Sequence, residues 1–176
     1  MELLDLYDYQ RRPTGKTMVR GDEHPAGMYP PVVHIVIFHP DGRMLIQQRQ
    51  PFKKGWPNYW DVSVGGSAQA GEDSPTAAMR ETREELGLTV DLTGQRPTLT
   101  NCSGGAFDDI YILELPVALS ELHLQPEEVQ SAAFATQEEI FAMIDDGRFI
   151  PYLKSFIMLL FDLHRRGGMV DCSKKK

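Results

Sequence analysis

The residues best suited to chemistry are three glutamates, Glu81, Glu84 and Glu85, in the stretch RETREEL. On a helix of about 3.6 residues per turn their carboxylates share one face. Like charges at this spacing destabilise a helix by roughly a few tenths of a kcal/mol per pair. Hard oxygen ligands on one rigid face suit Mg²⁺, which combines a few carboxylates with substrate phosphate oxygens. The alternative is a solvated face that Arg80 and Arg83 neutralise.

A glycine-rich loop, GGSAQAGE, precedes these glutamates. Gly65 and Gly66 allow the backbone to come close to a ligand. The loop would bring backbone carbonyls or amides to the edge of the acidic face. The combination therefore favours a metal and phosphate site over a merely charged surface.

The glutamates must be positioned by a helix, and its ends are visible in the sequence. Ser74 can cap the helix, and Pro75 suits the first helical position. Gly87 suits the left-handed residue just beyond the last turn. We therefore expect a helix from Pro75 to Leu86.

The surrounding elements interleave strands and helices without regular alternation. This pattern predicts an α/β fold, with helices on the faces of a mixed sheet rather than a doubly wound parallel sheet. A hairpin with its turn at RRPTGK (11–16) is expected within the first thirty residues. Strands are expected at 32–38, 44–49, 60–66, 89–94, 97–101 and 109–116, and further helices at 136–147 and 151–165.

Length and charge limit the classes of function. The 176 residues suit one domain, expected over 1–170 with 1–31 as a hairpin extension, followed by a disordered tail at 171–176. The formal charge of −7 disfavours nucleic-acid polymers and anionic membranes as partners. The N-terminus lacks the pattern of a signal peptide, and the apolar run 156–161 is too short to span a bilayer. The expected location is the cytoplasm.

The glycine loop and the glutamate helix together resemble the signature of the Nudix family. The fixed positions of that signature fall on Gly66, Glu72, Arg80, Glu81, Glu84, Glu85, Gly87 and Leu88. The one departure is Thr82, where an aliphatic residue is usual. The strand pattern on both sides is similar to the family's α/β/α sandwich with a mixed β-sheet.

The resemblance implies an enzyme, a pyrophosphohydrolase. It would hydrolyse the diphosphate linkage of a nucleoside diphosphate derivative, or of a related organic diphosphate, with Mg²⁺ or alternatively Mn²⁺. The cation would neutralise the diphosphate, and a carboxylate would accept the proton of the attacking water. By position in the motif, the metal ligands would be the Gly65 carbonyl and the carboxylates of Glu81, Glu84 and Glu85. One of these glutamates would be the base, and Arg80 would orient them.

Further candidates lie outside the motif. Arg49, Lys53 and Lys54 flank the expected site and could hold phosphates, the alternative being a solubilising loop. Glu128 lies where related enzymes often place an additional metal-binding or basic carboxylate. The aromatic residues Trp56, Tyr59 and Trp60 could stack on a base or cap the pocket, although Trp60 at a strand start also suits a core.

Two other functions remain open at the level of sequence. Isopentenyl diphosphate isomerase shares this fold, and GWPNYWDVSVGGSAQAGED is similar to its corresponding segment. The isomerase, however, has a cysteine and a histidine where this chain has Gly65 and Ser67. A Nudix-like module that binds a nucleotide without cleaving it usually lacks part of the glutamate motif, which is complete here. The apolar helix expected at 151–165 suits core packing or, alternatively, a homodimer interface.

Overall fold

A computed structural model describes residues 2–167. They divide into two compact units. The first contains residues up to 35, 64–84 and 88–111, and the second contains 36–63, 85–87 and the residues from 112 onwards. The tail expected at 171–176 lies outside the described residues, as do residues 168–170 of the expected domain.

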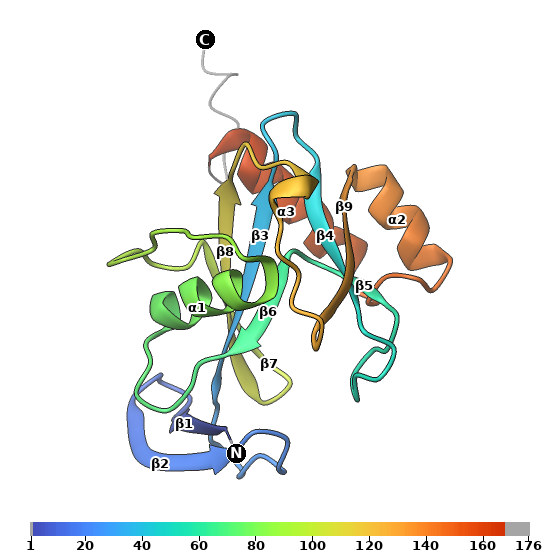
Figure 1. Cartoon of the computed structure of the whole chain (residues 1–176). Coiled ribbons are helices and arrows are strands. Elements are labelled where there is room, and N and C mark those ends of the chain that lie inside the picture. Colours follow the sequence, from blue (N-terminus) through green and yellow to red (C-terminus); the bar gives the residue numbers. More distant parts are fainter. Residues whose placement is uncertain (1, 168–176) are drawn as a thin grey trace. The chain divides into compact units, whose positions relative to one another are not determined.

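The first unit begins with the expected hairpin, which pairs β1 (Leu3–Tyr7) with β2 (Pro13–Val19) (Figure 1). Its turn lies earlier than predicted. The Asp8 carboxylate accepts hydrogen bonds from the backbone N–H groups of Gln10 and Arg12, at 2.9 Å each. These bonds close the turn before Pro13, so most of RRPTGK belongs to β2.

The same unit contains the glycine loop and most of the glutamate helix. Strand β3 (Pro31–Phe38) pairs there with β6 (Val64–Ser67), and β7 (Leu99–Ser103) pairs with β8 (Ala106–Glu114). The strand predicted at 89–94 is wrong. That segment turns instead, because the Asp91 carboxylate accepts from Thr93 N–H and the Leu92 carbonyl accepts from Gln95 N–H.

Helix α1 (Ser74–Leu86) has the predicted extent, but a different residue caps it. The Asp73 carboxylate accepts from Thr76 N–H at 3.0 Å, as an N-cap side chain does. The hydroxyl of Ser74 instead lies 2.9 Å from that of Tyr111. At the other end Gly87 has a φ of 72°, which confirms the predicted left-handed stop.

The second unit is built around β4 (Met44–Arg49). This strand pairs with β9 (Val129–Ala135) and with the short β5 (Trp60–Asp61). At its start, Met44 pairs with Phe38, the last residue of β3. Strand β9 is absent from the sequence-based prediction. Three of the seven residues in its sequence, VQSAAFA, are alanines, which strands do not favour.

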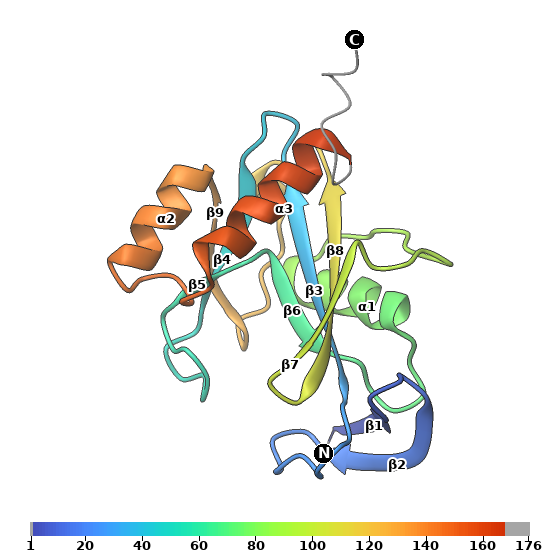
Figure 2. The same cartoon turned by 180° about the vertical axis from the view of Figure 1, so that it is seen from behind.

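Two helices complete this unit. Helix α2 (Gln137–Asp145), predicted at 136–147, begins with a capping box formed by Thr136 and Glu139. Helix α3 (Lys154–Arg166) starts later than predicted, after Pro151 and Leu153. It packs on β3, where the rings of Phe161 and His164 contact Phe38 (Figure 2). A single turn of 3₁₀ helix spans Leu119–Glu121.

The strands follow the hydrogen-bonded order β5-β4-β3-β8-β7, with β6 paired to β3 and β9 paired to β4. Strands β3 and β8 point the same way in Figures 1 and 2, whereas the ladders given above are antiparallel. The sheet is therefore mixed, as predicted. The strand predicted over 60–66 is split into β5 and β6. Over residues 2–167, no helix has the length and apolar character that crossing a bilayer requires.

Candidate active site

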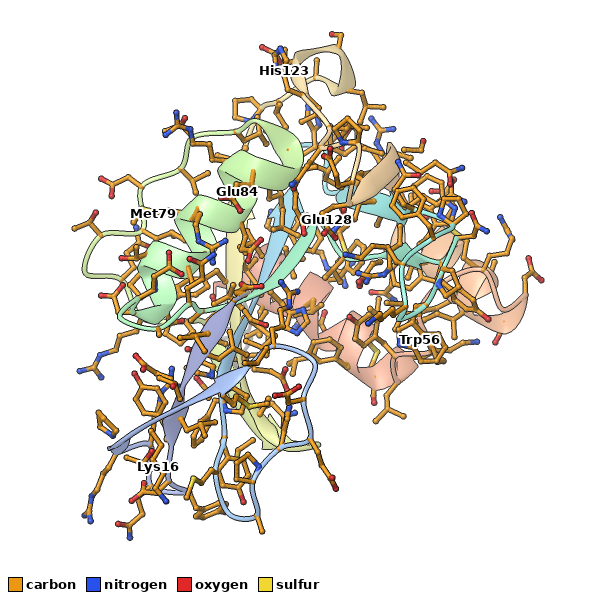
Figure 3. All side chains as sticks on the ribbon, turned by 60° about the horizontal axis from the view of Figure 1, so that its bottom comes forward. Lys16, Trp56, Met79, Glu84, His123 and Glu128 are labelled. Carbon is orange, nitrogen blue, oxygen red and sulfur yellow. The ribbon has the colours of Figure 1, made fainter. Side chains whose placement is uncertain are left out.

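The acidic face of α1 is only partly in contact with solvent. Glu81 and Glu85 are 7% and 4% exposed, whereas the Glu84 side chain is 47% exposed and projects from the helix (Figure 3). Ala77 and Ala78, one turn earlier, are fully buried. The acidic face is therefore not the fully solvated surface that the alternative interpretation of these glutamates requires.

In the first unit, Arg80 connects the helix to the glycine loop. Its Nε and Nη2 donate to the two carboxylate oxygens of Glu72 at 2.8 and 2.9 Å, and Nη2 also donates to the Ser67 carbonyl at 3.0 Å. Its Nη1 lies 2.9 Å from Glu81 Oε1 and 3.0 Å from Glu84 Oε2. These bonds raise the pKa of Arg80, Glu72 foremost. One guanidinium therefore serves three carboxylates.

The side chain of Glu81 packs closely against Gly66 of the glycine loop. An added Cβ at Gly66 would lie 2.1 Å from Cδ and Oε1 of Glu81, so any other residue there would displace the Glu81 carboxylate. Burial raises the pKa of Glu81, and the nearby Arg80 offsets only part of that rise. A buried carboxylate with a penalty for its charged form is stabilised by an additional cation.

In the second unit, Glu85 lies at the end of α1 against β4 and the segment before β9. Gln47 donates from Nε2 to Glu85 Oε2 at 2.9 Å, and Gln47 is itself only 3% exposed. The backbone carbonyls of Glu85 and Leu86 accept from the N–H groups of Gln125 and His123, at 3.0 and 2.9 Å. Gln47 is absent from the residues predicted for the site, although a polar residue directly after the apolar run MLI was a usable signal.

Glu128 lies at the end of that segment (Figure 3). Its carbonyl accepts from Gln50 N–H at 3.1 Å, and its own N–H donates to the Gln125 carbonyl at 3.0 Å. Its carboxylate forms an ion pair with Lys53 Nζ. Two of the predicted site residues, Glu128 and Lys53, are thus together, and the contacts through Gln125 connect them to the end of α1.

The remaining predicted cations differ in their surroundings. Arg49 donates from Nε to the Gly55 carbonyl at 3.1 Å, and its Nη1 lies 3.7 Å from Asp61 Oδ2. Arg49 therefore anchors the loop between β4 and β5. Lys54 is exposed on that loop.

Gly65 pairs with His34 in the β3–β6 ladder, and a Cβ there would make only ordinary contact with the His34 ring. The departure at Thr82 is accommodated in the interior, where its hydroxyl donates to the Ala78 carbonyl at 2.7 Å.

Within the described part of the chain, no three His, Cys, Asp or Glu side chains converge in a geometry that could hold a metal ion. The described carboxylates are instead oriented toward Arg80, Gln47 and Lys53.

Comparison with known proteins adds independent information. Residues 28–153 match the NUDIX domain family. The chain is 47% identical to the Nudix hydrolase lmo0368 of Listeria monocytogenes, over 93% of this chain and 95% of that one. It is 31% identical to the isopentenyl-diphosphate Delta-isomerase of Salmonella arizonae, over 77% of each. The crystal structure of DR0079 from Deinococcus radiodurans superposes with a TM-score of 0.73 and 28% identity, covering 90% of this chain and 97% of that one.

Proposed function

We propose that this protein hydrolyses a nucleoside diphosphate derivative or a related organic diphosphate in a Mg²⁺-dependent reaction. The basis is that the chain belongs to the Nudix family and is a hydrolase of phosphoric anhydride bonds. Mn²⁺ is the alternative cation. The predicted fold class, a Nudix-type α/β/α sandwich with a mixed sheet, is confirmed by the structural match. That residues 1–170 form one domain stays a prediction.

The observation that carries the proposal is a buried carboxylate on α1 whose charge the described cations offset only in part. Arg80 is shared by Glu72, Glu81 and Glu84. Arg20 also favours the charged form of Glu81, yet burial, at 7% exposure, still raises the pKa of Glu81. Carboxylate oxygens are the donors that Mg²⁺ prefers, so the residues present fit the cation chemically. When bound, a divalent cation neutralises the diphosphate and acidifies water.

We assign the protein's own groups as follows. Glu81, Glu84 and Glu85, the Gly65 carbonyl and Glu128 would bind the metal, and one of the three helix glutamates would accept the proton of the attacking water. Arg80 would orient the carboxylates, which its contacts in the first unit support. The cations Arg49, Lys53 and Lys54 would hold phosphate oxygens. For Lys53 this means exchanging its ion pair with Glu128 for substrate.

The isomerase is the second candidate, because an isomerase is among the relatives. Isomerisation of the double bond requires side chains that add a proton to one carbon and remove a proton from another. Gly65 and Ser67 supply neither a thiol nor an imidazole at the two relevant positions, and Cys102 is an exposed residue of β7. Hydrolysis is therefore the function we propose.

We propose that the protein acts in the cytoplasm on small-molecule diphosphates, not on nucleic-acid polymers or membranes. A homodimer is a further proposal, suggested by Leu153, Met158 and Leu159, which are 75%, 46% and 40% exposed at and in α3.

A product-resolved screen tests the proposal. Dinucleoside, sugar and simple nucleoside di- and triphosphates are incubated with Mg²⁺ or with a chelator, beside isopentenyl diphosphate. The expected result is cleavage of the P–O–P bridge in at least one nucleotide compound with Mg²⁺ only. An allylic isomer formed from isopentenyl diphosphate, without hydrolysis of any other compound, would favour the isomerase instead.

A further inference from the structure

A loop of residues 50–59 connects β4 and β5 (Figure 1). It exposes large aromatic side chains. Phe52 is 67% exposed and Trp56 is 46% exposed. Trp56 is labelled in Figure 3. Tyr59 meets Trp56 edge-on, with ring centroids 5.2 Å apart. Single exposed apolar residues are normal on protein surfaces, but Phe52 and Trp56 are two on one short loop, which makes this loop a candidate contact site for a ligand.

The backbone of this loop is held in an unfavourable conformation. Trp56 has a φ of 50° and Asn58 a φ of 64°. Asparagine tolerates this left-handed region, whereas a bulky residue such as tryptophan is an outlier there. Trp56 also precedes Pro57, and a residue before proline prefers extended conformations. Such strain persists only where the surroundings impose it, and it occurs preferentially at ligand-binding sites.

Here the neighbouring strand imposes the conformation. Arg49 Nε donates to the Gly55 carbonyl and Gln48 Nε2 donates to the Asn58 carbonyl, each at 3.1 Å. The Tyr59 carbonyl accepts from Arg49 N–H at 2.9 Å. The residues on both sides of Trp56 are thus fixed to β4, and the indole is presented by an anchored loop.

The same loop carries positive charge and is connected to the acidic end of α1. Lys53 pairs with Glu128, and the backbone of Glu128 is bonded to that of Gln125, which in turn bonds the Glu85 carbonyl. Lys54 is exposed, and among residues 2–167 it has no ion-pair partner. A loop that carries both an exposed aromatic ring and two lysines matches a ligand that has both a flat ring and phosphates.

We propose that Trp56 stacks on the nucleobase of the substrate while Lys53 and Lys54 face its phosphates. This inference deepens the proposed function, on which it rests for the identity of the reaction. It assigns the substrate class to compounds with an aromatic base. A diphosphate without such a ring would lack this contact.

Fluorescence tests the stacking directly, because Trp56 and Trp60 are the two tryptophans of the chain. Trp60→Phe leaves Trp56 as the reporter, and Trp56→Phe leaves Trp60. Each variant is titrated, with Mg²⁺, with the methylene diphosphonate analogue of a nucleoside diphosphate, which cannot be hydrolysed at that bridge. Methylene diphosphonate alone is the ligand without a base. We expect saturable quenching only for Trp56 with the nucleoside analogue; equal quenching of both reporters, or none, overturns the inference.

Binding affinity, measured by calorimetry, is the second measurement. Loss of one base–aromatic contact typically weakens binding by about tenfold, and we expect this for Trp56→Ala with the nucleoside analogue. Trp56→Phe should change affinity by less than about threefold, and the affinity for methylene diphosphonate should be the same in all variants. Leu153→Ala removes a comparably exposed apolar side chain and should have no effect. Equal weakening of both ligands by Trp56→Ala contradicts stacking.

The two proposals fail in different ways. If Trp56→Ala binds and hydrolyses every compound like the wild type, while Glu85→Gln hydrolyses none, the stacking inference is wrong and the hydrolase proposal stands. If Trp56 is quenched saturably but no nucleotide compound is cleaved, the stacking stands and the hydrolase proposal is wrong.

Discussion

Gln47 donates a 2.9 Å hydrogen bond from its side-chain amide to the Glu85 carboxylate in the interior of the second unit. Both side chains are almost fully buried, at 3% and 4% exposed. A donor to a buried carboxylate stabilises its charged form and fixes its orientation. We therefore regard Gln47 as a residue that positions Glu85 for metal binding.

Replacing Gln47 with leucine should weaken metal binding. Loss of such a supporting hydrogen bond typically costs about 10- to 100-fold in metal affinity or activity. We expect the Mg²⁺ concentration for half-maximal hydrolysis to rise by about tenfold or more, with a smaller change in rate at saturating Mg²⁺. The control is Gln95→Leu, since the Gln95 amide donates to the backbone carbonyl of Asp91 and not to a carboxylate of α1 among residues 2–167. Equal Mg²⁺ dependence in the two variants would show that Gln47 has no positioning role.

Adjacent glycines provide a matched pair. A Cβ at Gly66 would overlap Glu81 at 2.1 Å, whereas a Cβ at Gly65 would meet the His34 ring at 3.5 Å, an ordinary contact. Gly66→Ala must displace the Glu81 carboxylate, and we expect hydrolysis to fall by about a hundredfold or more, as for loss of a catalytic acid–base group. Gly65→Ala retains its carbonyl and should stay within about threefold of the wild type. Similar rates for the two variants would remove Glu81 from the reaction.

These residues also show what the sequence could reveal. The helix, its glycine stop and the shared face of the glutamates follow from spacing alone, because 3.6 residues per turn fix them. The supporting contacts do not. Gln47 is far from Glu85 in sequence, and only the folded sheet brings β4 beside the end of α1.

The errors in the fold have the same physical origin. Strand β9 has weak strand formers, and its ladder with β4 decides its conformation. The reverse holds at 89–94, where Thr and Val suggested a strand but the Asp91 carboxylate closes a turn. Asp73 displaced Ser74 as the helix cap because the Ser74 hydroxyl is engaged with Tyr111.

The N-terminal hairpin of the first unit should contribute to stability through Arg11. Both of its terminal nitrogens donate to Asp109, whose side chain is fully buried, and Thr100 donates to the same carboxylate. Arg11→Met would leave the buried Asp109 carboxylate without its cation, which typically lowers the free energy of unfolding by about 3–5 kcal/mol. Asp109→Asn leaves the guanidinium, 35% exposed, partly hydrated and should cost less, about 2 kcal/mol. Urea unfolding of both variants checks this order, and a larger cost for Asp109→Asn would contradict it.

The ion pair between Arg11 and Asp109 predicts that the free energy of unfolding depends on pH. Burial alone would raise the pKa of Asp109, but hydrogen bonds from Arg11, Ser74 and Thr100 outweigh it and lower that pKa. The stabilisation is therefore present above the unfolded-state pKa of about 3.9 and is lost as the pH falls through the lower folded-state value. The free-energy difference between wild type and Asp109→Asn should be constant from neutral pH to about pH 5 and shrink below about pH 4. A difference that grows on acidification would contradict the ion pair.

The most direct test of the central claim is the initial rate of nucleotide diphosphate hydrolysis at saturating Mg²⁺ in wild type and in Glu85→Gln. Glutamine retains the shape of the side chain but removes its charge and its capacity to accept a proton. Glu127→Gln is the matched control, one residue before Glu128 and exposed. We predict that Glu85→Gln loses about a hundredfold or more in rate while Glu127→Gln is unchanged. Equal rates in wild type and Glu85→Gln would show that the acidic face of α1 is not the catalytic site.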